Sequence, residues 1–124
     1  IYADVLEHIA DPESVLRGHR ARLEPGGTIL ISVPNFRYVE VFWQLAVRGK
    51  IDYQDAGIFD RTHVRITTRK LVESWLRELG LVEIEHEYRI NRKRDRLLTR
   101  IGLGLPAEFF AQQIIVTGRT PEVA

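Results

Sequence analysis

Apolar and polar positions follow two different periods along the chain, and the change of period separates predicted strands from predicted helices. The runs IYADVL (1–6) and TILISVP (28–34) are mostly apolar, as is typical of strands that are covered on both faces. Between them, residues 10–27 predict a helix that Asp11 caps and that a Pro-Gly-Gly turn ends. A strand, a helix and a strand with short connections form a βαβ unit with parallel strands.

Two further helices are predicted, with a long loop between them. Residues 35–50 predict a helix that Gly49 closes, whereas residues 51–66 show no period and predict a polar loop. Residues 67–80 give the clearest helix, which Thr67 or Thr68 can cap. Its apolar positions share one face: Leu71, Val72, Trp75, Leu76 and Leu79.

The last third of the chain predicts two strands joined by a long connection. Residues 81–90 alternate strictly, which indicates a strand with one wet face. Residues 91–108 are basic and contain glycine, so we expect a solvated loop, and residues 109–120 predict a final strand. The whole pattern predicts an α/β fold that begins with parallel strands and ends with an antiparallel pair.

Composition narrows the class of protein. The chain has 124 residues, of which 44% are hydrophobic and 28% are charged, as in one globular domain. The net charge of +1 attracts no anionic partner, and no apolar run reaches the ~20 residues that span a bilayer. We therefore expect neither nucleic acid nor a membrane as a partner. The absence of cysteine excludes disulfides and thiol catalysis and is compatible with a cytoplasmic protein.

Three segments in this order resemble the second half of class I S-adenosylmethionine-dependent methyltransferases: DVLEHIADPESVL (4–16), RLEPGGTILISVPN (22–35) and DRTHVRITTRKLVESWLRELGLVEIE (60–85). The resemblance implies a Rossmann-like half-sheet with flanking helices, in which the family's strands 4, 5, 7 and 6 lie side by side and the last strand is antiparallel. Residues 1–124 would then be the C-terminal part of a methyltransferase domain. The chain has no initiator Met and no glycine-rich loop after a first strand, so we expect it to be a piece of a longer protein.

The resemblance also assigns roles at the carboxyl end of the first strand, where ligands bind in open parallel sheets. It implies S-adenosyl-L-methionine as cofactor, and the residues expected to border its methionine part are Ala3, Asp4, Val5 and Leu6. His63 follows the long loop, where a neutral imidazole is able to accept a proton from a hydroxyl or amine, and His8 is the second candidate base.

Other polar residues have competing interpretations. Asn35 and Arg65 are expected to contact the acceptor substrate, although turn chemistry explains Asn35 equally well. Glu7 fits helix capping as well as it fits chemistry. His19 and His86 are interpreted as structural.

The predicted function is methyl transfer to a small-molecule or glycan acceptor, and two alternatives stay open. One is a degenerate, non-catalytic methyltransferase-like module that serves in interactions. The other is a metal-assisted RNA 2′-O-methyltransferase, because Asp4, Glu7, His8 and His63 resemble the divalent-metal site of the small-RNA 3′-terminal enzymes. Asp4 replaces a longer Glu in that pattern, so the favoured interpretation has no metal.

The first strand raises one expectation about assembly. Without a neighbour on its outer side, the segment IYADVL would be a sheet edge with only Asp4 to blunt it. We therefore expect the isolated chain to form a homodimer.

Overall fold

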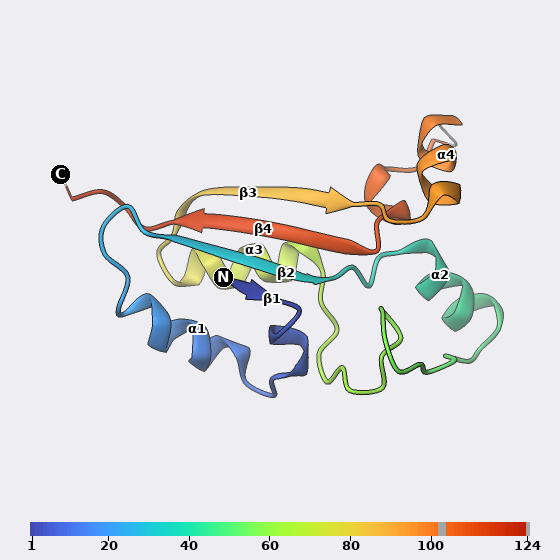
Figure 1. Cartoon of the computed structure of the whole chain (residues 1–124), viewed down its shortest axis with the longest axis horizontal. Helices are drawn as coiled ribbons and strands as arrows, with labels where there is room; N and C mark the ends of the chain where they lie inside the picture. The colour runs from blue at the N-terminus through green and yellow to red at the C-terminus, as the bar shows by residue number, and fades with distance from the viewer. Residues whose placement is uncertain (102–103, 124) are drawn as a thin grey trace.

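The computed structural model describes residues 1–101 and 104–123 and is built on a four-stranded sheet (Figure 1). The strands are β1 (Tyr2–Ala3), β2 (Thr28–Pro34), β3 (Val82–Arg89) and β4 (Gln113–Arg119). Their spatial order is β1-β2-β4-β3, with β1 parallel to β2 and with β4 antiparallel to both of its neighbours. This confirms the predicted half-sheet and its antiparallel last strand, although the first strand is shorter than predicted.

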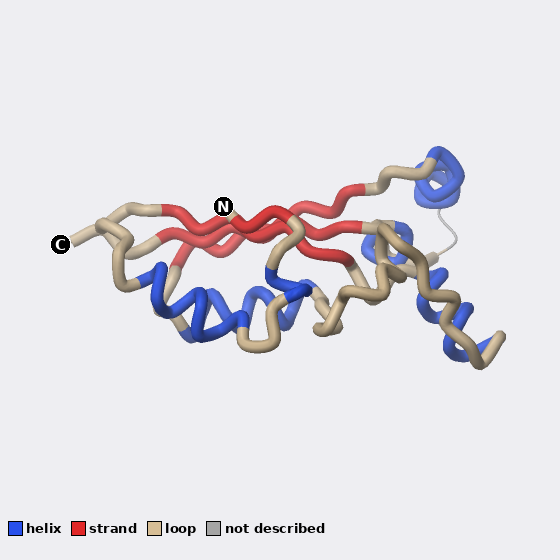
Figure 2. The backbone as a smooth tube through the Cα atoms, turned by 60° about the horizontal axis from the view of Figure 1, so that its bottom comes forward, coloured by secondary structure: helices blue, strands red, loops and turns tan. Residues whose placement is uncertain are grey.

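Two helices, α1 (Pro12–Arg20) and α3 (Arg69–Glu78), lie on the same face of the sheet (Figure 2). Both predicted caps are present: the Asp11 carboxylate accepts from the backbone N–H of Ser14 at 3.1 Å, and the Thr68 hydroxyl accepts from that of Leu71 at 3.4 Å. The sheet and these helices enclose the main hydrophobic core: Tyr2, Leu6, Leu16, Ile29, Ile31, Val33, Val72, Trp75, Leu76, Leu81, Ile114 and Val116.

The alternation of β3 is as predicted from Ile84 onward, but not at its start: a register shift lies between Val82 and Glu85, Glu83 has φ of 50°, and Val82 is exposed rather than packed on the core. Ile84 and Tyr88 pack against the core beneath α3, and His86 lies 3.3 Å from Glu73 of that helix. The glutamates Glu85 and Glu87 are exposed on the other face of the sheet. One face of β3 is therefore exposed to solvent, and α1 and α3 lie on the opposite face of the sheet (Figure 2).

The second predicted helix begins later than the sequence pattern indicates. Residues 35–38 are not helical; α2 (Val39–Phe42) follows them and continues as the π-helix η2 (Trp43–Val47). The reason is Asn35, whose side-chain amide donates to the backbone carbonyls of Glu108 and Ala111 and holds this segment as a turn. A second small core of Tyr38, Val41 and Phe59 then ties α2 to the following loop.

The basic segment after β3 is not the solvated loop that was predicted. It contains α4 (Lys93–Ile101) and the short 3₁₀ helix η3 (Ala107–Phe110), so β4 begins at Gln113. The physical reason is Asp95, which is fully buried and accepts hydrogen bonds from the hydroxyl of Tyr38 and the amide of Gln112. Within the described ranges, no helix has the length and apolar character needed to cross a membrane.

Candidate functional site

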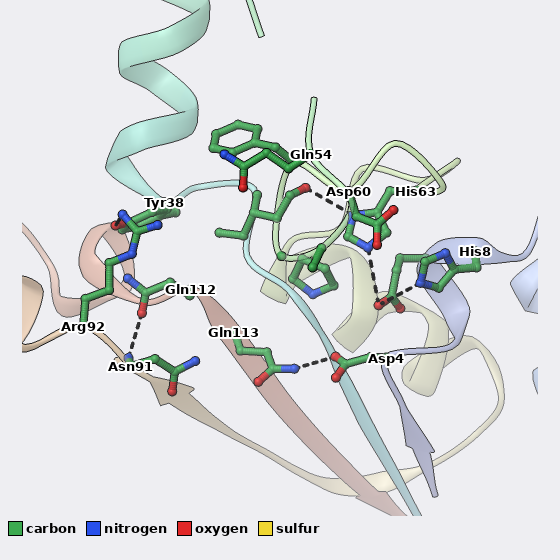
Figure 3. A pocket seen from close by; sticks show the side chains of 16 residues that line it. Asp4, His8, Tyr38, Gln54, Asp60, His63, Asn91, Arg92, Gln112 and Gln113 are labelled. Atoms are coloured by element: carbon green, nitrogen blue, oxygen red, sulfur yellow. Dashed lines mark hydrogen bonds and ion pairs between the residues drawn. The ribbon is translucent and has the colours of Figure 1, made fainter. Parts of the chain in front are cut away.

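A cavity of about 410 Å³ opens at the carboxyl ends of β1 and β2 (Figure 3). Its lining comes from the end of β1, the loop of residues 54–63, the segment 91–92 and the start of β4. Such a volume lies in the range of sites for small ligands. The cavity is also where an open parallel sheet binds them, so it is the candidate site.

The end of β1 turns sharply at Asp4. This residue has φ of 53°, a left-handed conformation that non-glycine residues rarely adopt, and its exposed carboxylate accepts a hydrogen bond from the amide of Gln113. The turn allows the 3₁₀ helix η1 (Leu6–His8) to start beside the sheet end. Of the four residues expected to border the cofactor, only Asp4 has its side chain in the lining; Ala3 and Val5 are exposed and Leu6 lies in the core.

Glu7, His8 and His63 form a compact cluster at this end of the cavity (Figure 3). The Nε2 atoms of His8 and His63 lie 3.8 and 3.9 Å from Oε1 of Glu7. The two imidazole rings are 4.8 Å apart between centroids. The structure therefore brings together both histidines that the sequence singled out, although 55 positions separate them.

Main-chain hydrogen bonds explain how the distant segments meet. The backbone carbonyl of Glu7 accepts from the N–H groups of Val64 at 2.9 Å and Arg65 at 3.2 Å. The loop is further ordered by Asp60, whose carboxylate accepts from the backbone and hydroxyl of Thr62; these bonds lower the pKa of Asp60. Glu7 thus does not cap α1, a role that Asp11 fills, and its main chain instead positions the loop that carries His63.

The hydrogen-bond partners of the two rings fix their tautomers. Nδ1 of His63 lies 3.1 Å from the carbonyl oxygen of Ile58, and Nδ1 of His8 lies 3.2 Å from that of Thr62. The Thr62 hydroxyl also lies 3.0 Å from Nδ1 of His8, and because it donates its proton to Asp60 it can only accept from the ring. Because a carbonyl only accepts, each Nδ1 carries the proton and each neutral ring keeps a lone pair on Nε2. Both lone pairs are therefore on the nitrogen that lies nearest to Glu7.

The carboxylate of Glu7 is almost completely buried, with 1% of the residue exposed. Within the described residues its Oε2 atom has no hydrogen-bond partner. Burial raises the pKa of Glu7 above its ordinary value of 4.5, with a smaller contribution in the same direction from Asp4, while the two histidines act in the opposite sense. A buried carboxylate facing two imidazole lone pairs is an arrangement that favours a cation, either a proton or a metal ion.

The cluster has the donor types that a divalent metal uses. One ligand atom from each of Glu7, His8 and His63 lies within 4.8 Å of the others, and mixed oxygen and nitrogen donors suit a divalent transition metal such as manganese. Asp4, the fourth residue of the predicted metal pattern, is not within this group and is held by Gln113 instead.

Asn35 and Arg65 do not line the cavity. The amide of Asn35 is buried and engaged by backbone groups, including the carbonyl of Ala111 at 2.9 Å. Arg65 is exposed, and its guanidinium donates to the backbone carbonyl of Ala10. In this structure both side chains hold loops in place next to the site, as turn chemistry indicated for Asn35.

Sequence reasoning missed the opposite end of the cavity, which Tyr38, Gln54, Asn91, Arg92 and Gln112 line (Figure 3). None of them belongs to the three segments that carried the family resemblance. The available signal was an acidic residue, Asp95, within a basic stretch, which is compatible with a helix that packs against the fold rather than a solvated loop.

A family model described as a methyltransferase domain matches residues 2–86 of the chain. Comparison with curated proteins gave no significant match. Solved structures do match, and the likenesses below confirm the fold.

The crystal structure of a SAM-dependent methyltransferase from Archaeoglobus fulgidus gives a TM-score of 0.64 at 14% identity, covering 96% of this chain and 57% of that one. Phosphoethanolamine N-methyltransferase 2 of Haemonchus contortus, in complex with S-adenosyl-L-methionine, gives 0.57 at 13% identity, covering 97% and 32%. The CurJ carbon methyltransferase gives 0.54 at 17% identity, covering 97% and 28%.

The chain spans little more than half of the first of these structures and about a third or less of the other two. The family match, by contrast, extends over most of the chain and includes η1 and the loop with His63. The chain belongs to the methyltransferase-domain family.

Proposed function

We propose that this chain takes part in S-adenosylmethionine-dependent methyl transfer to a hydroxyl or amine of a small-molecule or glycan acceptor, with His63 as general base. The observation that carries the proposal is the contact of 3.1 Å between Nδ1 of His63 and the carbonyl oxygen of Ile58, which assigns the proton to Nδ1 and leaves the lone pair on Nε2 at the ligand-binding end of the sheet. The named relatives are an N-methyltransferase and a carbon methyltransferase, so the fold alone does not select the acceptor atom.

The cofactor that the family implies suits the charges at this end of the cavity. S-adenosylmethionine has a sulfonium and an ammonium group, both positive. Asp4, Glu7 and Asp60 place three carboxyl groups in the lining here, and the exposed carboxylate of Asp4 follows β1 directly. Asp4 is therefore the residue proposed to hold the ammonium group; the bound cofactor supplies an electrophilic methyl group.

The chain's own chemical task is removal of a proton. As the acceptor becomes a nucleophile, its proton moves to Nε2 of His63, while Nδ1 stays bonded to the carbonyl of Ile58. The resulting imidazolium is stabilised by the carboxylate of Glu7 at 3.9 Å. His8 lies on the other side of Glu7 at 3.8 Å and provides a second site for the same proton.

A metal-assisted reaction is the second candidate, favoured by the convergence of Glu7, His8 and His63. A divalent ion bound to their three ligand atoms would act as a Lewis acid that polarises the acceptor hydroxyl. The two candidates make opposite demands on the same nitrogen atom, because a metal ligand cannot also be the base. Activity measured after removal of divalent metal therefore distinguishes the two candidate mechanisms.

Two measurements on the full protein test the proposal. Calorimetric titration with S-adenosylhomocysteine reports cofactor binding, and transfer of a labelled methyl group to an acceptor mixture reports activity. We expect both to be positive. A folded protein that binds no cofactor would instead support the degenerate interaction module.

We also propose that the isolated chain self-associates. Among the residues that the structure describes, β1 pairs with β2 alone. Ile1 is 92% exposed and Val5 is 43% exposed, so an apolar edge is open to a second copy. Light scattering is expected to give the mass of a dimer. A folded monomer at high concentration would contradict this account of the edge.

A further inference from the structure

The cavity has a second end, away from Glu7 and His63, that the proposed chemistry does not use (Figure 3). The segment of residues 91–101 is here called the arm, and its first two residues, Asn91 and Arg92, line this end. The other lining residues here are Tyr38, Gln54 and Gln112. We propose that this end is the acceptor-recognition site and that it binds the hydroxyl groups of a carbohydrate. The inference rests on the proposed function and names the substrate class.

Hydrogen bonds anchor the arm to the rest of the fold. Asp95 has no exposed surface and accepts from the hydroxyl of Tyr38 at 2.7 Å and from the amide of Gln112. The carbonyl oxygen of the same Gln112 side chain accepts from the backbone N–H of Asn91 at 2.7 Å. Gln112 thus connects the buried carboxylate to the first residue of the arm, so the position of Asn91 at the cavity is fixed by the core.

The polar groups that remain free are mixed donors and acceptors. Within residues 1–101 and 104–123, the side-chain amides of Gln54 and Asn91 have no hydrogen-bond partner, and both side chains are exposed at the cavity. Each amide offers two N–H donors and one carbonyl acceptor. Gln113 donates its N–H to Asp4, which leaves its carbonyl oxygen as a further acceptor.

This inventory decides between a carbohydrate and an anion. A phosphate or carboxylate accepts only, so it needs donors and positive charge. The cation at this end, Arg92, is already paired with Glu40 at 2.7 Å, and the carboxylates of Asp4 and Asp60 face the same cavity. Hydroxyl groups both donate and accept, which matches neutral amides next to carboxylates and a paired arginine.

The position of the arm in the sequence supports a role in substrate choice. The family match ends at residue 86, so Asn91, Arg92 and Gln112 lie outside the part of the chain that the family shares. The cluster of Glu7, His8 and His63 lies inside it. Tyr38 and Gln54 of the same wall lie inside the match, so this end combines residues within the family match with residues beyond it. A wall built partly beyond the family match is compatible with one fold serving different acceptors.

Binding of simple glycosides tests the proposal directly. The full protein, saturated with S-adenosylhomocysteine, is mixed with methyl glycosides of glucose, galactose and mannose, and saturation-transfer NMR records which of them bind. We expect at least one glycoside to bind, and we expect Gln54→Ala with Asn91→Ala to weaken it about tenfold or more. Lys93→Ala is the matched control, because Lys93 is exposed on the same arm and does not line the cavity.

The outcomes separate this inference from the function on which it rests. Cofactor binding with no glycoside bound overturns the carbohydrate site and leaves methyl transfer standing. If the double variant and Lys93→Ala weaken glycoside binding equally, the carbohydrate site is overturned as well. If the wild-type protein does not bind the cofactor at all, the proposed function itself is contradicted. Thermal melting of each variant confirms that the fold is intact.

Discussion

The two ends of the cavity are built in different ways. One end, here called the sheet end, contains Glu7, His8 and His63. Main-chain hydrogen bonds between η1 and the loop that carries His63 fix Glu7 and His63, whose side chains face one another without a hydrogen bond between them. At the arm end, Asp95 has its hydrogen bonds satisfied, while the side-chain amides of Gln54 and Asn91 have no partner in the part of the chain that the structure describes. The difference agrees with the two proposals, proton removal at one end and recognition of hydroxyl groups at the other. A variant at one end should therefore change kcat, and a variant at the other should change KM.

The largest effect is expected at the sheet end. His63→Ala removes the proposed base, so we expect kcat in the full protein to fall by about 10²-fold or more with little change in the dissociation constant of S-adenosylhomocysteine. Steady-state kinetics with labelled cofactor, combined with calorimetry, measure the two quantities. His86→Ala is the control, because that histidine lies on β3 beside Glu73. Unchanged kcat in the His63 variant would leave this residue structural.

The next effect is expected at the arm end. Asp95→Ala leaves the hydroxyl of Tyr38 and the amide of Gln112 without their buried acceptor. We expect KM for the acceptor to rise about tenfold while kcat stays within about twofold, and we expect faster amide exchange in α4. Asp95→Asn keeps one acceptor oxygen and should recover part of the affinity. A fall in kcat with unchanged KM would contradict a role in recognition.

A smaller effect on stability is expected at Glu7. Because burial raises the pKa of this carboxyl, the folded state binds its proton more tightly, and stability falls as the pH rises from 4.5 through the raised pKa. Glu7→Gln removes the buried charge, so we expect Tm to increase by a few degrees at pH 8. The gain should vanish below about pH 4, where Glu7 is protonated in both states. A variant less stable than wild type at pH 8 would contradict the assignment.

The smallest effect is expected from metal removal. If His63 is the base, a chelator leaves kcat unchanged, because the lone pair of Nε2 is free to accept a proton. The assay compares EDTA-treated full protein with the same protein after addition of Mg²⁺ or Mn²⁺. Loss of activity that either ion restores would show that Glu7, His8 and His63 bind metal.

The strands and helices were predictable from local patterns, and the family resemblance pointed to the residues of the sheet-end cluster. Strand alternation and the caps at Asp11 and Thr68 need only residues close in sequence, whereas the strand order was implied by the family resemblance. His8 and His63 stood out because they flank predicted elements. Their shared orientation toward Glu7 could not be predicted, because it depends on hydrogen bonds between main-chain groups that lie more than 50 positions apart.

The arm end escaped prediction for a related reason. The segment 91–101 is mostly basic and polar, and such composition is typical of solvated loops. Its helix is fixed by Asp95, whose partners Tyr38 and Gln112 lie 57 positions before it and 17 positions after it. A single buried carboxylate with distant partners leaves no periodic signal in the sequence.

The histidines themselves offer the most direct test of the central claim, that the cofactor binds at the sheet end beside the base. The chain has four histidines: His8 and His63 line the cavity, whereas His19 stacks on Tyr2 and His86 lies beside Glu73. NMR of the imidazole resonances in the full protein, titrated with S-adenosylhomocysteine, reports all four at once. We predict that the signals of His8 and His63 shift with saturation while those of His19 and His86 stay in place. Saturable binding that leaves the signals of His8 and His63 unmoved would contradict the account.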